Sequence, residues 1–141
     1  MKFVVAADED RPVVAFIAKN LREKGHDVRV LPVTAWARVA VDAATAVSRG
    51  EADQAVICCW TGTGVTIAAN KVPGIRAALC VDAQTASGAR KWNDANVLTL
   101  SLRLMSEPVA AEILEAWLGE KYAGTEDESL DVISREERKD A

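Results

Sequence analysis

The 141-residue sequence lacks several features that would assign it to a class at once. It has no apolar run near the roughly 18 residues that a membrane-spanning helix needs. Its N-terminal segment turns acidic after six residues, too soon for a signal peptide. It also has no excess of positive charge, because 17 Lys and Arg stand against 21 Asp and Glu, and no basic face is available for nucleic-acid phosphates. We expect a cytoplasmic protein with no membrane or nucleic-acid partner.

Cysteine and histidine are scarce, which narrows the chemistry. Cys58, Cys59 and Cys80 are odd in number and form no CxxC pair, so neither a disulfide framework nor a zinc or redox pair is predicted. The single histidine, His26, excludes Cys–His nucleophilic machinery and His-rich metal sites. We expect no metal and no cofactor. Any catalysis must use cysteine, carboxylates, threonine hydroxyls or backbone amides.

The sequence does contain an alternation of short apolar runs and helical patterns. The runs predict five strands, at Lys2–Ala7, Val28–Val33, Gln54–Trp60, Ile75–Cys80 and Asn96–Leu100. The helices between and after them are expected to follow the capping residues Asp10, Thr34, Asp82 and Ser106. Such alternation predicts a Rossmann-like three-layer α/β/α fold around a five-stranded parallel sheet, with ligands at the carboxyl ends of the strands.

The last residues of the chain differ from the rest in composition. Residues 120–141 hold eight acids and four bases, which accounts for the whole net charge of −4. Their pattern allows one more exposed helix. We therefore divide the chain into an α/β domain over residues 1–119 and an acidic C-terminal tail over residues 120–141, which could pack on a partner subunit.

The most informative strand end is the glycine-rich turn Thr61-Gly62-Thr63-Gly64, which lies between a strand and a helix. Backbone N–H groups of such a turn converge on an anion, helped by the helix dipole. The third glycine of a dinucleotide-binding turn and the Lys-Ser/Thr of a P-loop are both missing. A plain helix start is the alternative interpretation.

Cys59 lies just before this turn, where amide groups and a helix N-terminus would stabilise a thiolate. A thiolate beside an anion-binding turn suits removal of a proton next to a carbonyl and stabilisation of the resulting enediolate. A buried, inert thiol is the competing interpretation. Trp36, Trp60 and Trp92 each adjoin a loop that we place near this site, where they would form a pocket wall or a partner interface.

Four ordered blocks carry a resemblance to a known family. They are Gly50-Glu51-Ala52-Asp53, the segment 59–64, the segment 67–78 and the segment 93–98. Together they resemble the ribose-5-phosphate isomerase type B family, which includes the galactose-6-phosphate isomerase subunits, over residues 1 to about 122. The resemblance implies an aldose–ketose isomerase that needs no metal, forms an enediolate, and has its active sites at the interface of a homodimer or a dimer of dimers.

By position, the resemblance implies a catalytic pair, Cys59 and Thr61, and a substrate-binding set, Asp8, Gly62, Thr63, Gly64 and Asn93. We add Glu9 and Arg38 as substrate-binding candidates that the family pattern does not supply. Cys59 matches the base that moves the proton, and the segment 61–64 matches the turn that holds the enediolate oxygens. Asp8 matches an acidic residue that contacts sugar hydroxyls, and Asn93 matches a substrate-contacting asparagine.

Five segments depart from the family pattern: Glu9 for histidine, Trp60 for glycine, Trp36-Ala37-Arg38-Val39 for Tyr-Pro-Asp-Tyr, Trp92 for the ring-opening histidine, and Gly124-Thr125-Glu126-Asp127-Glu128 for an arginine-bearing tail. An indole cannot shuttle the ring-opening proton. The tail loses Arg–phosphate bonds that stabilise by about 1.5–3 kcal/mol each.

These departures predict that the substrate is not the standard ring-closed pentose phosphate. An open-chain, short or unphosphorylated sugar would fit, as would an anion bound by Arg38 or Arg11, although a solvated helix residue is the plain interpretation of Arg38. The alternative function is a non-catalytic sugar-binding or scaffold relative. A receiver-type signalling domain is excluded, because the third strand ends in Cys58-Cys59-Trp60 rather than in aspartate.

Overall fold

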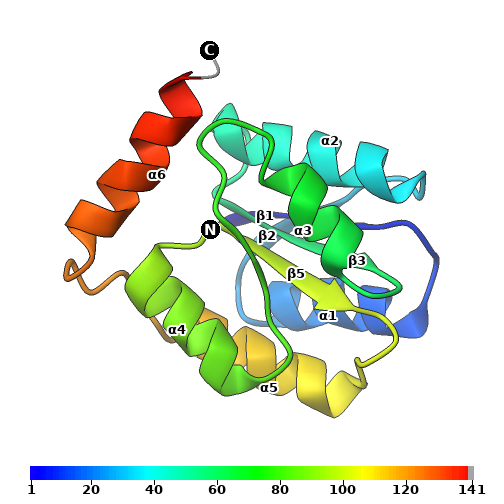
Figure 1. Ribbon diagram of the computed structural model, residues 1–141. Helices are drawn as coiled ribbons and strands as arrows, with labels where there is room; N and C mark the ends of the chain where they lie inside the picture. Colours follow the sequence, from blue (N-terminus) through cyan, green and yellow to red (C-terminus); the bar gives the residue numbers. More distant parts are fainter. Residues whose placement is uncertain (140–141) are drawn as a thin grey trace.

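Strands and helices alternate along residues 1–139, the part of the chain that the computed structural model describes (Figure 1). In chain order the elements are β1 (Lys2–Ala7), α1 (Pro12–Glu23), β2 (Asp27–Val30), α2 (Trp36–Ser48), β3 (Gln54–Cys59), α3 (Thr63–Ala69), β4 (Ala77–Leu79), α4 (Ala83–Asn93), β5 (Val97–Ser101), α5 (Glu107–Leu118) and α6 (Asp127–Lys139).

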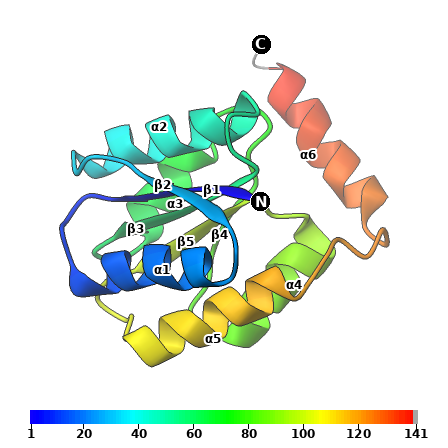
Figure 2. The same cartoon turned by 180° about the vertical axis from the view of Figure 1, so that it is seen from behind.

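All five strands are parallel and form one sheet in the order β2-β1-β3-β5-β4. Helices α1, α4 and α5 cover one face, and α2 and α3 cover the other (Figures 1 and 2). Connections between parallel strands are right-handed, so the side of the sheet toward which a connection runs decides which face its helix covers. Helices α1 and α4 lead toward the β2 side of the sheet, and α2 and α3 lead toward the β4 side, so the two pairs cover opposite faces. The expected three-layer α/β/α fold is confirmed.

The sheet separates two apolar cores because successive side chains of a strand point to opposite faces. Along β1, Phe3 and Val5 enter the core beneath α1, α4 and α5, whereas Val4 and Ala6 enter the core beneath α2 and α3. A strand buried on both faces needs apolar residues at every position. That requirement explains the continuous apolar runs from which β1 and β3 were predicted.

The edge strands are shorter than the sequence predicts. β2 ends at Val30 instead of Val33, and β4 covers only Ala77–Leu79 instead of 75–80. Each has a partner on one side only, and its pairing stops at Val30 and at Leu79, although the neighbouring strands β1 and β5 each continue two residues further. Apolar residues beyond the last paired position, such as Val33 and Val81, are exposed instead.

Two of the four expected helix caps are correct. The side chains of Asp82 and Ser106 accept hydrogen bonds from the third amide of α4 and of α5, respectively. The other two expectations are wrong, because α1 and α2 begin after Arg11 and Ala35 without a side-chain cap. In α1, Pro12 occupies the first turn and supplies the helical φ angle there.

Helix α6 stands apart from the α/β domain (Figure 1). None of its described residues is buried, and a hydrogen bond of 2.8 Å runs from the Gly74 amide of the domain to the Glu137 carboxylate of the helix. Within residues 1–139, no helix combines the length and the apolar character needed to cross a membrane.

Candidate active site

The carboxyl ends of β1, β3 and β5 bring the expected catalytic segment together with the acidic segment after β1. Ala7 of β1 pairs with Cys58, and Cys59 pairs with Ser101 of β5. The Asp8 amide donates a hydrogen bond to the Cys58 carbonyl at 3.4 Å, which continues the register and places Asp8 beside Cys59. Residues separated by about 50 positions therefore meet at one edge of the sheet.

The three cysteines occupy different environments. Cys58 points into the core beneath α1, α4 and α5, while Cys59 points to the face covered by α2 and α3. Cys58 and Cys80 are completely buried, and burial raises the pKa of each thiol to about 12, so both stay protonated near neutral pH. Cys59 retains 5% of its surface at the strand end. It is therefore the only one of the three that solvent or a ligand can reach.

The turn after Cys59 requires glycine at its centre. Gly62 has φ +77°, and a Cβ there would lie 2.5 Å from a Leu79 methyl carbon and 3.1 Å from the main chain of Leu100. This close approach lets the chain enter α3 immediately after the strand. The Thr66 hydroxyl bonds the Gly62 carbonyl at 2.6 Å, and the hydroxyls of Thr61 and Thr63 bond each other at 2.8 Å.

The first turn of α3 presents its backbone donors beside Cys59. The Thr66 amide donates to the Gly62 carbonyl, and this is the first hydrogen bond of α3. The amides of residues 63–65 precede it, so they have no acceptor within the helix and point to the carboxyl edge. Such amides, with the helix dipole, favour a negatively charged oxygen. A partly accessible thiol and a turn with unbonded helix amides are thus adjacent in the structure.

Residues after β5 hold this segment in place. The Leu102 amide donates to the Cys59 carbonyl and the Arg103 amide to the Trp60 carbonyl, both at 2.9 Å, and the Ser101 hydroxyl also bonds the Trp60 carbonyl at 2.9 Å. Sequence analysis did not assign roles to Ser101 and Arg103. The available signal was their position at the end of the fifth predicted strand, where the carboxyl edge of the sheet was expected.

Trp36, at the start of α2, lies against the same turn. A Cβ on Gly64 would lie 2.8 Å from a ring carbon of Trp36, so the indole rests on the glycine itself. Trp36 and Trp60 remain about half exposed at the carboxyl edge, as expected for a pocket wall or an interface. Trp92 does not lie beside Cys59 within one chain, because α4 carries it to the opposite edge, where its ring lies against Gly88 of its own helix.

The acidic segment after β1 contributes two carboxylates with different partners. Burial, and secondarily the charge of Glu9, raises the pKa of Asp8. Within the described residues, the buried Oδ1 of Asp8 has no hydrogen-bond partner. A buried polar atom of this kind calls for a partner such as a ligand hydroxyl. Glu9 is bound by the Arg11 guanidinium at 2.7 Å.

Two expected site residues are not brought to Cys59 within one chain. Arg38 lies exposed on α2, where it faces Asp42 at 3.6 Å, which supports the plain interpretation of a solvated helix residue. Asn93 lies at the amino edge of the sheet, before β5, whereas Cys59 pairs with the last residue of β5. The length of β5 alone separates those edges by about 13 Å.

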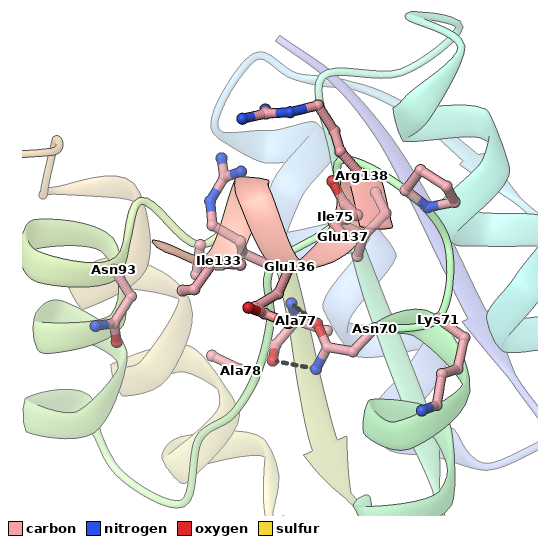
Figure 3. A pocket seen from close by; sticks show the side chains of 13 residues that line it. Asn70, Lys71, Ile75, Ala77, Ala78, Asn93, Ile133, Glu136, Glu137 and Arg138 are labelled. Carbon is pink, nitrogen blue, oxygen red and sulfur yellow. Dashed lines mark hydrogen bonds between the residues drawn. The ribbon is translucent and has the colours of Figure 1, made fainter. Parts of the chain in front are cut away.

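Asn93 lines a groove of about 730 Å³ at that amino edge (Figure 3). The groove lies between the end of α3, the start of β4, the end of α4 and α6, with Ile133 and Glu136 contributed by α6. In residues 1–139 no cluster of three histidine, cysteine or acidic side chains could hold a metal ion.

Comparison with known proteins places nearly all of the α/β domain and the first half of α6 in one group. The model of the Ribose/Galactose Isomerase family matches residues 4–133. Ribose-5-phosphate isomerase B of Escherichia coli (strain K12) is 38% identical over 115 residues, covering 77% of this chain and 76% of that protein. D-erythrulose-4-phosphate isomerase of Pectobacterium atrosepticum is 43% identical over 86 residues, covering 61% of this chain and 57% of that protein. The solved structure of Clostridium thermocellum ribose-5-phosphate isomerase B superposes with a TM-score of 0.95 at 32% identity and covers 100% of both chains.

Proposed function

The chain belongs to the ribose/galactose isomerase family, and we propose that it is an aldose–ketose isomerase that moves one proton between neighbouring carbons of a sugar phosphate. The observation that carries the proposal is the placement of Cys59, the one cysteine with exposed surface, beside the free amides of α3. The two relatives described above are named for a five-carbon and a four-carbon substrate, so membership alone leaves the chain length of the substrate open.

In the proposed reaction Cys59 acts as a thiolate. It takes the proton from the carbon next to the carbonyl, the C–H electron pair becomes part of the enediolate double bond, and the carbonyl oxygen becomes negatively charged. Amides at the start of α3 stabilise that oxygen. Cys59 then returns the proton to the former carbonyl carbon. The electrons stay within the substrate, so the balance needs no redox cofactor.

Proton transfer between the two oxygens completes the isomerisation. The hydroxyl hydrogen of one carbon must reach the oxygen of the other, and we assign this relay to Thr61, whose Oγ1 already shares a hydrogen bond with Thr63 at 2.8 Å. Asp8 supplies an unpaired Oδ1 that can accept a sugar hydroxyl. Glu9 contributes through Arg11, which it holds.

We further propose that the protein works as a homodimer in which each site includes Asn93 of the other copy. Asn93 and Cys59 lie at opposite edges of one chain, so a twofold arrangement that sets edge against edge would bring them together. Large apolar side chains surround the carboxyl edge and are about half exposed there: Val33, Trp36, Trp60, Val81 and Leu104. A second copy would cover them. The three free cysteines fit a reducing compartment, and we place the protein in the cytoplasm.

The second candidate is a non-catalytic sugar-binding relative. The observation that favours it is Trp92, whose ring lies against Gly88 and which offers no group that accepts a proton. A catalytic protein with this residue must use a substrate that does not need ring opening. The two candidates differ in whether the C–H bond of a bound sugar is ever broken.

Solvent-deuterium exchange into aldoses and ketoses, phosphorylated and unphosphorylated, distinguishes these candidates. We expect wild-type protein to exchange the proton next to the carbonyl of at least one sugar phosphate, and Cys59→Ala to lose about 10²–10⁴ in rate because the base is gone. Cys80→Ala, which removes a thiol that is protonated near neutral pH, is the matched control and should stay within a few-fold of wild type. Equal rates in wild type and Cys59→Ala would refute the role of Cys59, and no exchange on any sugar would favour the binding protein.

A further inference from the structure

Two threonine side chains form a hydrogen-bonded pair beneath the turn that follows Cys59. The Thr66 hydroxyl, on α3, donates to the Gly62 carbonyl at 2.6 Å. The hydroxyl oxygens of Thr66 and Thr99 lie 2.5 Å apart, and this contact joins α3 to the centre of β5 across 33 positions of the chain. We call Thr66 and Thr99 the threonine pair.

The direction of both hydrogen bonds follows from the chemistry of the groups. A carbonyl oxygen can only accept, so the proton between Thr66 and Gly62 belongs to Thr66. The single hydroxyl proton of Thr66 is then used, so Thr99 must donate to the Thr66 oxygen. The Thr66 amide adds little to the bonding of the Gly62 carbonyl, because its nitrogen lies 3.4 Å from that oxygen. The threonine pair therefore supplies the main hydrogen bond of the Gly62 carbonyl.

Packing alone does not account for a hydroxyl at position 99. Thr99 is completely buried, and its neighbours in the sheet are Ile57 of β3 and Leu79 of β4. Valine has nearly the same shape and would fill this place without bringing a polar group into an apolar core. A buried hydroxyl reduces stability unless it is hydrogen-bonded. The bond from Thr99 to Thr66 therefore indicates a role at the turn.

The Gly62 carbonyl controls the amide of the next residue, because both belong to one planar peptide unit. In a trans peptide the C=O and N–H bonds point in opposite directions. The threonine pair holds the Gly62 oxygen toward α3 and β5, so the Thr63 N–H points away from them, to the carboxyl edge where Cys59 ends β3. Thr63 is the first residue of α3, and its amide has no acceptor within the helix.

This peptide unit would rotate easily without the threonine pair. Gly62 has φ +77° and no side chain that would resist a change of its backbone angles. A half-turn of the unit would set the carbonyl oxygen at the carboxyl edge and the Thr63 amide toward the core. A carbonyl oxygen at the edge would repel an enediolate oxygen, which the amide attracts. One rotation would thus replace an attractive group with a repulsive one.

We propose that the threonine pair holds the Gly62–Thr63 peptide unit in the orientation in which the Thr63 amide binds the enediolate oxygen. Thr66 and Thr99 are positioning residues, because they act through this peptide unit and do not touch the substrate. The inference rests on the proposed isomerase function for its consequence in catalysis. The orientation of the peptide unit can be measured without a substrate, so failure of this inference and failure of the isomerase proposal are distinguishable.

The first test determines the orientation of the peptide unit in crystal structures of full-length variants. Thr66→Ser keeps a hydroxyl that can bond the Gly62 carbonyl and should keep the wild-type orientation, whereas Thr66→Val should show the rotated unit in part or all of the molecules. Thr66→Ala also lacks the hydroxyl and favours the helix, so it replaces Thr66→Val if that variant does not fold. A wild-type orientation in the variant without a hydroxyl would refute the proposal.

The second test measures how the turn responds to a negative oxygen. Ribonate 5-phosphate and ribitol 5-phosphate differ only in carrying a carboxylate or a hydroxymethyl group at the first carbon, and erythronate 4-phosphate and erythritol 4-phosphate differ in the same way. Calorimetric titration of wild type should show a preference for the anionic member of at least one pair. Thr66→Val should lose this preference while it binds the neutral member within a few-fold of wild type.

Two further variants serve as references in the titration. Thr66→Ser should keep the preference for the anionic probe, because its hydroxyl remains. Thr45→Val, which removes a half-buried hydroxyl from α2, should also keep it. Equal weakening of the anionic and the neutral probe in Thr66→Val would show that Thr66 only supports the fold, and that result would refute the positioning role.

The kinetic consequence is measured on the sugar phosphate that wild type isomerises. Thr66→Val should lower kcat by about 10²–10³, the loss expected for one oxyanion donor, with little change in KM. Thr99→Val should lower kcat less, because Thr66 can still donate to Gly62. If no sugar phosphate is isomerised but the peptide unit rotates in Thr66→Val, the isomerase proposal fails and the holding of the peptide unit stands. If isomerisation is found and Thr66→Val keeps the wild-type kcat, the inference is refuted and the isomerase proposal stands.

Discussion

At the scale of single residues, Asp8 illustrates how a binding group can reduce the stability of the fold. Its carboxyl is partly buried, lies beside Glu9, and has an oxygen without a hydrogen-bond partner among the described residues. These conditions raise its pKa above the ordinary value of 3.8. The folded state then holds this proton more tightly than the unfolded state does. Its contribution to stability is present below that ordinary value and is lost as the pH rises through the raised pKa.

Asp8→Asn should therefore stabilise the folded protein at pH 7, because the neutral amide avoids the desolvation of a charge, while sugar binding becomes weaker. The gain in thermal midpoint should disappear below about pH 4, where the wild-type carboxyl is protonated in both states. Thermal unfolding followed by circular dichroism at the two pH values measures this. Asp10→Asn removes the same charge at an exposed position and is the control. A lower midpoint for Asp8→Asn at pH 7 would contradict the prediction.

At the scale of secondary-structure elements, the junction between β3 and α3 depends on one glycine. Gly62→Ala should cost about 1–2 kcal/mol for a side chain at positive φ, with roughly 1–3 kcal/mol more from crowding against Leu79 and Leu100. Gly50→Ala tests the first contribution alone, since Gly50 has φ +75° and nothing lies within 4 Å of a Cβ there. Urea unfolding of both variants measures the difference. Similar losses would show that the close packing around Gly62 has no effect.

The elements also show what the sequence could predict. The buried runs of β1 and β3, the caps at Asp82 and Ser106, and the turn at Gly62 follow from local rules, and the structure agrees with each. The ends of β2 and β4 were missed because pairing with a neighbour, rather than apolar character, decides where an edge strand stops. The cation–π contact of Arg11 with Trp60 was missed because it joins loops about 50 residues apart.

At the scale of the whole molecule, Asn93 and Cys59 lie at opposite edges of one chain. Whether they act on one substrate therefore depends on how two chains assemble. Sequence analysis placed Asn93 in the site through resemblance alone, although its position before a strand already indicated the opposite edge of the sheet. If each site takes its base from one copy and Asn93 from the other, the two residues act together only between chains. A mixture of variants tests this directly.

Co-expressed Cys59→Ala and Asn93→Ala chains should recover about a quarter of wild-type activity, although each variant alone is nearly inactive. Half of randomly formed dimers are mixed, and a mixed dimer has one intact site and one site with both defects, as twofold symmetry requires. Initial rates of the purified mixture, compared with each variant purified alone, give the result. If Asn93 served the site of its own chain, mixing would restore nothing, because both sites of a mixed dimer would carry one defect.

The stability of helix α6 in the acidic tail depends on the contacts that this helix makes. Helix α6 is 13 residues long and buries none of its described side chains, and a free helix of that length is only marginally stable in water. In the proposed homodimer, a second copy of the chain would supply further contacts that stabilise this helix. Dilution, which dissociates a dimer, would then reduce the helical content of the tail. That helical content would depend on the protein concentration.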